Sequence, residues 1–300
     1  MILGLNSRLA AATELDEPTQ EIPDADWYYR LADELKHRSN LIGAIRAYQA
    51  LLEVKPSEAR ARYLLGNILA RQREWQRAIQ EYRRVLDVRP DYVQARHKLG
   101  LAFRAVRRWR ESYETLISCA QIEPSDGAVF LSLGVLLMDL QQPAYAVRAF
   151  GRAVQLAPTD ARVHYRLGRA LLAAGYPKRA LQTWQRAVAL DETWQAARYD
   201  LGVLYLQLER YTPAIAEFQR LLEQAPDDMD SAYCLALAYK ETNRLDETVA
   251  LLEQVVARRP DLYMAHFHLG AIFLRLGLSE RGMHHMRRYE QLRESADDQR

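Results

Sequence analysis

The sequence predicts an all-α protein, a solenoid of about eight stacked helical hairpins. Two periodic features indicate it: prolines recur every 34 residues, and a Leu-Gly or Leu-Ala pair keeps the same step. A hydrophobic content of 49% supplies enough apolar side chains for a continuous core. A period of this length identifies a chain built from repeats, so two ordinary globular domains are not expected. The periodic prolines are Pro56, Pro90, Pro124, Pro158, Pro226 and Pro260, and the series lapses at Glu192.

Each repeat is expected to hold two amphipathic helices. In the second repeat Leu65 and Leu69 recur at helical spacing, and so do Ala78 and Tyr82 after a polar break. The proline ends the second helix because it lacks an N–H and clashes with the preceding turn. We expect the residue after each proline position to cap the next helix with its side-chain oxygen. The expected caps are Ser57, Asp91, Ser125, Thr159, Thr193, Asp227 and Asp261.

Further residues keep the same phase. A bulky residue follows the glycine by three positions, a small one by twelve, and a large side chain, often aromatic, by sixteen. In one repeat these are Gly134, Leu137, Ala146 and Phe150. The order resembles the tetratricopeptide repeat (TPR) family, over residues 25 to about 296. The resemblance implies a right-handed superhelix whose concave face is lined by the first helix of each hairpin.

The predicted solenoid has eight units, preceded by an acidic segment, 1–24, and followed by a polar tail, 297–300. We expect the acidic segment to be partly disordered or to form a short helix, and we hypothesise that it competes for the basic part of the groove. The last unit is a degenerate capping unit, because a terminal helix has one face without a neighbour. The units are 25–58, 59–92, 93–126, 127–160, 161–194, 195–228, 229–262 and 263–296.

Composition and motifs predict a protein that is not an enzyme and has no cofactor. We find no phosphate-binding glycine loop, nucleophile elbow or zinc-protease helix in the sequence. The histidine pairs His266 with His268 and His284 with His285 stand too close along a helix to share a metal ion. The cysteines Cys119 and Cys234 lack metal-site spacing, and we predict no metal site. No secretory or membrane segment is recognised, so we expect a cytoplasmic location.

The resemblance implies which side chains project into the concave groove, because particular positions of the first helix face inward in this family. Basic residues at both sides of an apolar centre predict a ligand that combines acidic and apolar residues. The chaperone-binding clamp of some family members is not reproduced, because Tyr63 and Lys98 stand where lysine and asparagine would be needed. The predicted groove residues are Arg60, Tyr63, Asn67, Arg71, His97, Lys98, Leu101, Arg104, Val135, Met138, Arg162, Tyr165, Arg166, Arg169, Tyr199 and Tyr233.

The predicted function is therefore that of a scaffold or adaptor that binds a protein or peptide partner. One alternative is a regulatory or substrate-recognition subunit of an enzyme complex, such as one built around a glycosyltransferase. Another is nucleic-acid binding through residues 59–126, which hold 14 basic and 8 acidic residues. Residues 195–262 hold 7 basic and 12 acidic residues, and this asymmetry predicts head-to-tail self-association.

Overall fold

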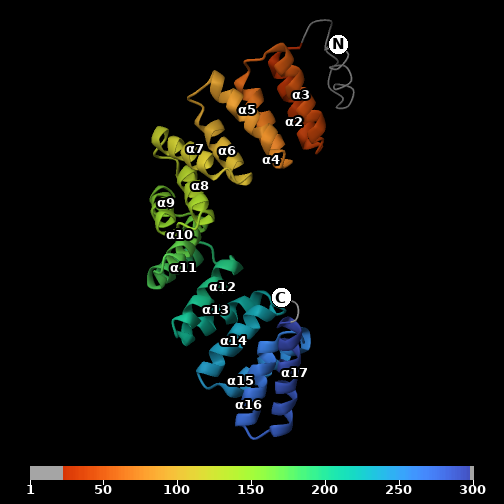
Figure 1. Cartoon of the computed structure of the whole chain (residues 1–300), viewed down its shortest axis with the longest axis vertical. Helices are drawn as coiled ribbons and strands as arrows, with labels where there is room; N and C mark the ends of the chain where they lie inside the picture. The colour runs from red at the N-terminus through yellow and green to blue at the C-terminus, as the bar shows by residue number, and fades with distance from the viewer. Residues whose placement is uncertain (1–22, 298–300) are drawn as a thin grey trace. The chain divides into compact units, whose positions relative to one another are not determined.

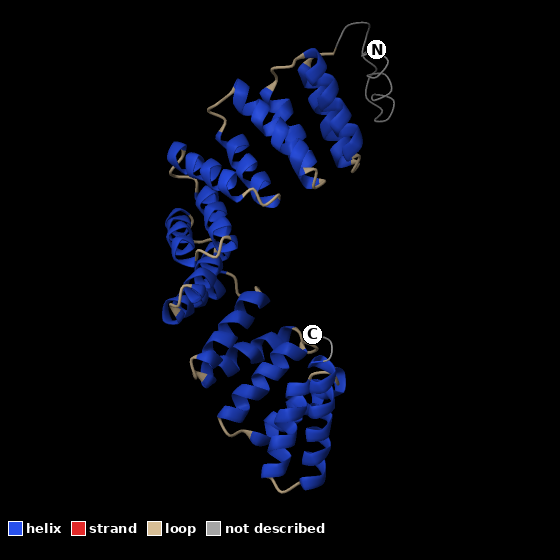
Figure 2. Ribbon diagram, in the orientation of Figure 1, coloured by secondary structure: helices blue, strands red, loops and turns tan. Residues whose placement is uncertain are grey.

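The computed structural model describes residues 23–297, and within this range every regular element is a helix (Figure 2). The all-α fold class is therefore confirmed. Residues 1–22, which make up all but the last two residues of the predicted acidic segment, lie outside the described residues, and so does its predicted competition for the groove. None of the helices in the described range is both long and apolar enough to cross a membrane. The chain divides into two compact units, of which the first ends at Ala157 and the second begins at Pro158.

The first unit holds four antiparallel helical hairpins, drawn from red to green in Figure 1. Its helices are α2 (Ala25–His37), α3 (Leu41–Val54), α4 (Ala59–Arg71), α5 (Trp75–Val88), α6 (Val93–Ala105), α7 (Trp109–Ile122), α8 (Gly127–Asp139) and α9 (Pro143–Leu156). The even-numbered member of each pair is the first helix of its hairpin, so successive first helices begin 34 residues apart.

The second unit repeats the arrangement with four more hairpins. Its helices are α10 (Ala161–Ala173), α11 (Pro177–Leu190), α12 (Gln195–Gln207), α13 (Tyr211–Gln224), α14 (Met229–Glu241), α15 (Leu245–Arg258), α16 (Tyr263–Arg275) and α17 (Ser279–Asp297). α17 is the longest of the described helices, and Gly282 is its one buried residue. Its exposure fits a helix that closes the end of a stack.

The two helices of a hairpin approach closely where the glycine of the Leu-Gly pair lies. A Cβ atom on Gly66 would stand 2.7 Å from the ring of Tyr82, and one on Gly134 would stand 2.6 Å from the ring of Phe150. Both rings are almost fully buried. The glycine therefore leaves the space that the large side chain of the second helix fills, and the core of each unit is a row of such contacts.

The helix caps differ from the sequence-based expectation by one residue. The proline and the residue after it form a turn, closed in one repeat by the N–H of Glu58 donating to the carbonyl of Lys55 at 3.1 Å. The cap position therefore moves to the residue that follows the turn. Asp126, Asp160 and Asp228 accept backbone N–H bonds there, whereas the other cap positions between successive hairpins have no side-chain cap bond.

Candidate functional site

The first helices of neighbouring hairpins are joined by side-chain contacts between residues 35 positions apart. In the first unit the ring nitrogen Nε2 of His97 lies 2.8 Å from the hydroxyl of Ser132. About two turns further along the same face of α6, Nε of Arg104 donates to a carboxylate oxygen of Asp139 at 2.5 Å. These two contacts hold α6 and α8 side by side, and they bracket the predicted apolar centre.

The side chains between those contacts form the surface that the sequence predicts as the groove centre. Leu101 on α6 and Val135 and Met138 on α8 are half-buried, which leaves apolar surface open to solvent. Lys98 on α6 and Arg71 on α4 are exposed, and neither has a carboxylate partner within residues 23–297. We call these five residues the inner surface of the first unit.

Three further predicted residues of α4 make contacts within the fold. The guanidinium of Arg60 lies over the ring of Tyr29, 4.5 Å from its centroid. Asn67 accepts a hydrogen bond from the hydroxyl of Tyr82 at 2.8 Å. The ring of Tyr63 lies 5.2 Å from that of Tyr92, centroid to centroid. These residues are therefore already engaged in packing the hairpins.

The predicted tyrosines of the second unit also connect neighbouring hairpins. The hydroxyl of Tyr165 donates to Asp200 at 2.6 Å, and the hydroxyl of Tyr199 lies 3.6 Å from the sulfur of Cys234. Burial, followed by the bond to Asp200, raises the pKa of Tyr165 to about 12. The ring of Tyr233 lies beside that of His268. A role in stacking the first helices accounts for all three without a ligand.

The predicted arginines of α10 are less committed to the fold. Arg162 forms an ion pair with Asp160 at 2.9 Å, close to the surface. The carboxylate of Asp160 also caps α10. Arg166 and Arg169 are exposed and have no carboxylate partner in the described part of the chain. Within residues 23–297 the structure therefore places positive charge without a carboxylate partner on α10, whereas the half-buried apolar residues among the predicted groove residues, Leu101, Val135 and Met138, lie on α6 and α8.

A second surface lies where the two helices of one hairpin face each other, at the fourth residue of the first helix and the seventh residue of the second. In α4 and α5 these are Arg62 and Glu81, which form an ion pair of 2.9 Å with both side chains mostly buried. Arg198 and Glu217 make the same pair, of 2.6 Å, in α12 and α13. The arginine also donates to a backbone carbonyl six residues earlier, as Arg62 does to Pro56 at 2.8 Å.

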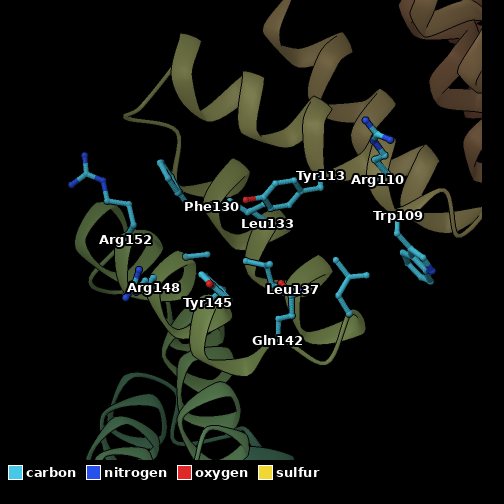
Figure 3. A pocket seen from close by; sticks show the side chains of 12 residues that line it. Trp109, Arg110, Tyr113, Phe130, Leu133, Leu137, Gln142, Tyr145, Arg148 and Arg152 are labelled. Carbon is cyan, nitrogen blue, oxygen red and sulfur yellow. The ribbon is translucent and has the colours of Figure 1, made fainter.

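In α8 and α9 the same two positions hold Phe130 and Ala149, and a pocket of about 830 Å³ opens beside them. The floor comes from α8 and the two walls from the second helices α7 and α9. Figure 3 shows Leu133 and Leu137 near the centre of the view, with Arg110 and Arg152 toward opposite sides. The lining residues are Trp109, Arg110, Tyr113, Phe130, Leu133, Leu137, Leu140, Gln142, Tyr145, Arg148, Ala149 and Arg152.

The pocket lies outside the groove that the sequence predicts, because the predicted residues are all expected to project inward from the first helices. A signal was nevertheless present. When the repeats are aligned, Phe130 stands where five of the seven other repeats have arginine or histidine, and Ala149 stands where two have glutamate; the first repeat has Tyr28 and Ala47 at these positions. A large apolar residue opposite a small one, in place of a buried ion pair, marks a gap in the polar packing.

Comparison with known proteins agrees with the hairpin architecture. Two family models, both described as Tetratricopeptide repeat, match the chain, while no curated protein matches it. One model matches residues 29–93, 67–112, 131–196 and 233–297, and the other matches residues 171–238.

Several solved structures share the fold. PilF of Pseudomonas aeruginosa is 21% identical with a TM-score of 0.58, over 73% of this chain and 96% of its own. YrrB, described as a TPR protein with an unusual peptide-binding site, is 23% identical with a TM-score of 0.53, over 63% of this chain and 97% of its own. MamA of Desulfovibrio magneticus RS-1 is 22% identical with a TM-score of 0.54, over 57% of this chain and 97% of its own.

At these identities the likeness to solved structures shows the fold, and the family models cover most of the described residues. TPR proteins are typically non-catalytic scaffolds, and the repeats of this chain support a protein-interaction scaffold. With its hairpins at 34-residue intervals and its glycine-to-ring contacts, the chain belongs to the tetratricopeptide repeat family.

Proposed function

We propose that this scaffold binds an acidic and apolar segment of a partner protein on the inner surface of its first unit. The observation that carries the proposal is the combination of two basic side chains without carboxylate partners, Arg71 and Lys98, with the half-buried residues Leu101, Val135 and Met138. Within the described chain, no ion pair or side-chain hydrogen bond engages these five residues, and three of them leave part of an apolar side chain open to water.

The chemistry of the surface favours that ligand. A carboxylate of the partner would gain charge-assisted hydrogen bonds from Lys98 or Arg71. An apolar side chain next to it would remove the exposed parts of Leu101 and Met138 from water. Arg104 is less available, because it already pairs with Asp139. The peptide-binding site of YrrB, a protein of the same fold, lends the proposal further support.

Selection from a random dodecapeptide phage library on the full chain tests the proposal. We expect enriched peptides to combine Asp or Glu with aliphatic or aromatic residues. An Arg71→Glu, Lys98→Glu variant should weaken their binding about tenfold or more, because hydrogen bonds to charged groups contribute about 1.5–3 kcal/mol each.

The matched control is Arg186→Glu, which makes the same charge change at an exposed position of a second helix in the other unit. It should leave the affinity of the peptides unchanged. Enriched peptides without acidic residues, or peptides that bind the Arg71→Glu, Lys98→Glu variant as tightly as the original chain, would contradict the proposal.

A further inference from the structure

The pocket between α7, α8 and α9 carries an inference of its own. We propose that it is a second docking site, which takes a segment of a partner protein that presents an aromatic or large aliphatic side chain beside Asp or Glu. The site is separate from the inner surface, and the proposal does not depend on that surface binding anything.

The floor and walls of the pocket are apolar and partly open to water. Leu133 and Leu137 form the floor together with Phe130, and the tyrosines Tyr113 and Tyr145 stand on the walls. Tyr113 is 41% exposed and Tyr145 is 59% exposed, although both are large rings. A volume of about 830 Å³ lies within the range of about 300–1,000 Å³ that holds ligands in proteins. An inserted ring would therefore bury surface that the fold leaves open.

The rim of the pocket is positive, which selects an acidic partner. Arg148 contacts the ring of Tyr145, 5.8 Å from its centroid, and has no carboxylate partner among the described residues. Arg152 donates to the side chain of Gln155 and to the carbonyl of Pro124, both neutral groups. Arg110 pairs with an exposed glutamate, and such a surface pair is readily exchanged. Guanidinium groups bind carboxylates through two parallel hydrogen bonds, so Asp or Glu beside the inserted side chain is the complementary chemistry.

The pocket and the inner surface use different faces of α8. At about 100° per residue, Val135 and Met138 point about 140° and about 80° away from Phe130 around α8, so the two surfaces face in different directions. No residue of the inner surface lines the pocket. Two segments could therefore bind the first unit at once without sharing a side chain.

Arginines toward opposite sides of the pocket favour a polypeptide segment over a compact apolar compound (Figure 3). A segment can place carboxylates on both sides of one buried side chain, where they would bind the arginines. A small uncharged molecule would contact only the apolar floor of the pocket. Binding of such a molecule would be indifferent to salt, while binding of an acidic segment weakens as salt screens the charges.

The test isolates the pocket from the inner surface. A random dodecapeptide library is selected on the full chain carrying Arg71→Glu and Lys98→Glu, with counter-selection on the same protein carrying Ala149→Leu as well. The added leucine fills the pocket, and Leu251 shows that the fold accepts leucine at this position of a repeat. Recovered peptides are synthesised with a fluorescent label, and their affinities for the original chain and its variants are measured by anisotropy.

We expect recovered peptides to carry an aromatic or large aliphatic residue within a few positions of Asp or Glu. Arg148→Glu should weaken their binding about tenfold, the change expected for one charge-assisted hydrogen bond, and Arg186→Glu should not change it. Arg148 is exposed, so this variant folds even if Ala149→Leu does not. Three results would overturn the proposal. The first is that no peptide is enriched over the counter-selected protein, the second that the enriched peptides are uncharged and their affinity does not change with salt concentration, and the third that Arg148→Glu leaves the affinity unchanged.

Discussion

The groove beside Arg62 and the groove beside Phe130 overlap in position when two repeats of the first unit are aligned. The first has a volume of about 420 Å³ and the second of about 830 Å³. Four lining positions correspond between them: Arg62, Leu65, Glu81 and Arg84 in the smaller groove become Phe130, Leu133, Ala149 and Arg152 in the larger. Helix lengths and the glycine-to-ring contact are the same in both hairpins.

The difference shows that a hairpin can fold with either an ion pair or an apolar pair at these two positions. The ion pair between Arg62 and Glu81 places two charged groups in the groove. Each needs the other, because a buried charge without a partner destabilises the fold. Phe130 and Ala149 need no such partner, and they leave apolar space. The repeat can therefore carry either a buried ion pair or an apolar pair at these two positions while its helix lengths stay the same.

The largest expected effect comes from breaking the ion pair in the smaller groove. Glu81→Ala leaves the guanidinium of Arg62, whose side chain is only 14% exposed, without its carboxylate. Removing one partner of a buried pair costs about 3–5 kcal/mol, and the lower end, about 3 kcal/mol, suits a pair that water still reaches. Urea unfolding followed by circular dichroism measures the loss. A loss below about 0.5 kcal/mol would mean that the pair does not hold this hairpin, as is typical of exposed pairs.

Replacing both residues should restore much of that loss. The Arg62→Phe, Glu81→Ala variant copies the pair of the larger groove and leaves no uncompensated charge. We expect it to be more stable than Glu81→Ala alone by about 1–2 kcal/mol in the same unfolding experiment, since both partners are exchanged together. If the double variant were less stable than the single one, the two grooves would not be interchangeable solutions.

In the last hairpin the positions that correspond to Arg62 and Glu81 hold His266 and His285. This histidine pair predicts that stability depends on pH. Their Nδ1 atoms lie 2.9 Å apart, and Nε2 of His266 donates to the carbonyl of Pro260 at 3.2 Å. Burial, and after it the neighbouring cationic groups, lower the pKa of His285 to about 4, and burial also lowers the pKa of His266. The unfolded chain, with histidine pKa values near 6.5, then binds more protons than the folded one, so stability should fall as the pH drops from about 6.5 toward 4.

The matched control is the His266→Phe, His285→Ala variant, which again copies the larger groove. It keeps His268, whose pKa is also lowered to about 4, and all the carboxylates. Melting temperatures measured between pH 7 and pH 4 should fall less steeply for this variant than for the original chain. Identical slopes would show that the histidine pair takes up no additional protons on unfolding.

The smallest effect should come from the exposed partner of Glu81. Arg84 pairs with the same carboxylate at 2.8 Å, but its side chain is 57% exposed. Solvent screens such a pair, so Arg84→Ala should change the free energy of unfolding by less than about 1 kcal/mol. Urea unfolding of the Arg84→Ala and Glu81→Ala variants under the same conditions compares the two losses of unfolding free energy. Equal losses from Arg84→Ala and Glu81→Ala would mean that burial does not decide the strength of these pairs.

The repeat pattern was enough to predict the hairpins, because Gly134 and Phe150 each have a packing role that their residue types reveal. It placed the helix caps one residue early, since the turn that Pro56 begins consumes the following residue. The role of Tyr165 could not be decided, because its partner Asp200 comes from another repeat. The pocket depends on Phe130 and Ala149, which lie on different helices, and neither residue is unusual by itself. Only the alignment of whole repeats shows that together they replace an ion pair.

Calorimetric titration of a pocket-selected peptide into the full chain and into its Phe130→Arg, Ala149→Glu variant tests the central claim most directly. The variant installs the ion pair of the smaller groove in the larger one and should melt within a few degrees of the original chain. We predict one binding site in the original chain and no detectable binding to the variant. Equal affinity for the two proteins would contradict the claim that this pair of positions decides whether the groove is open to a partner.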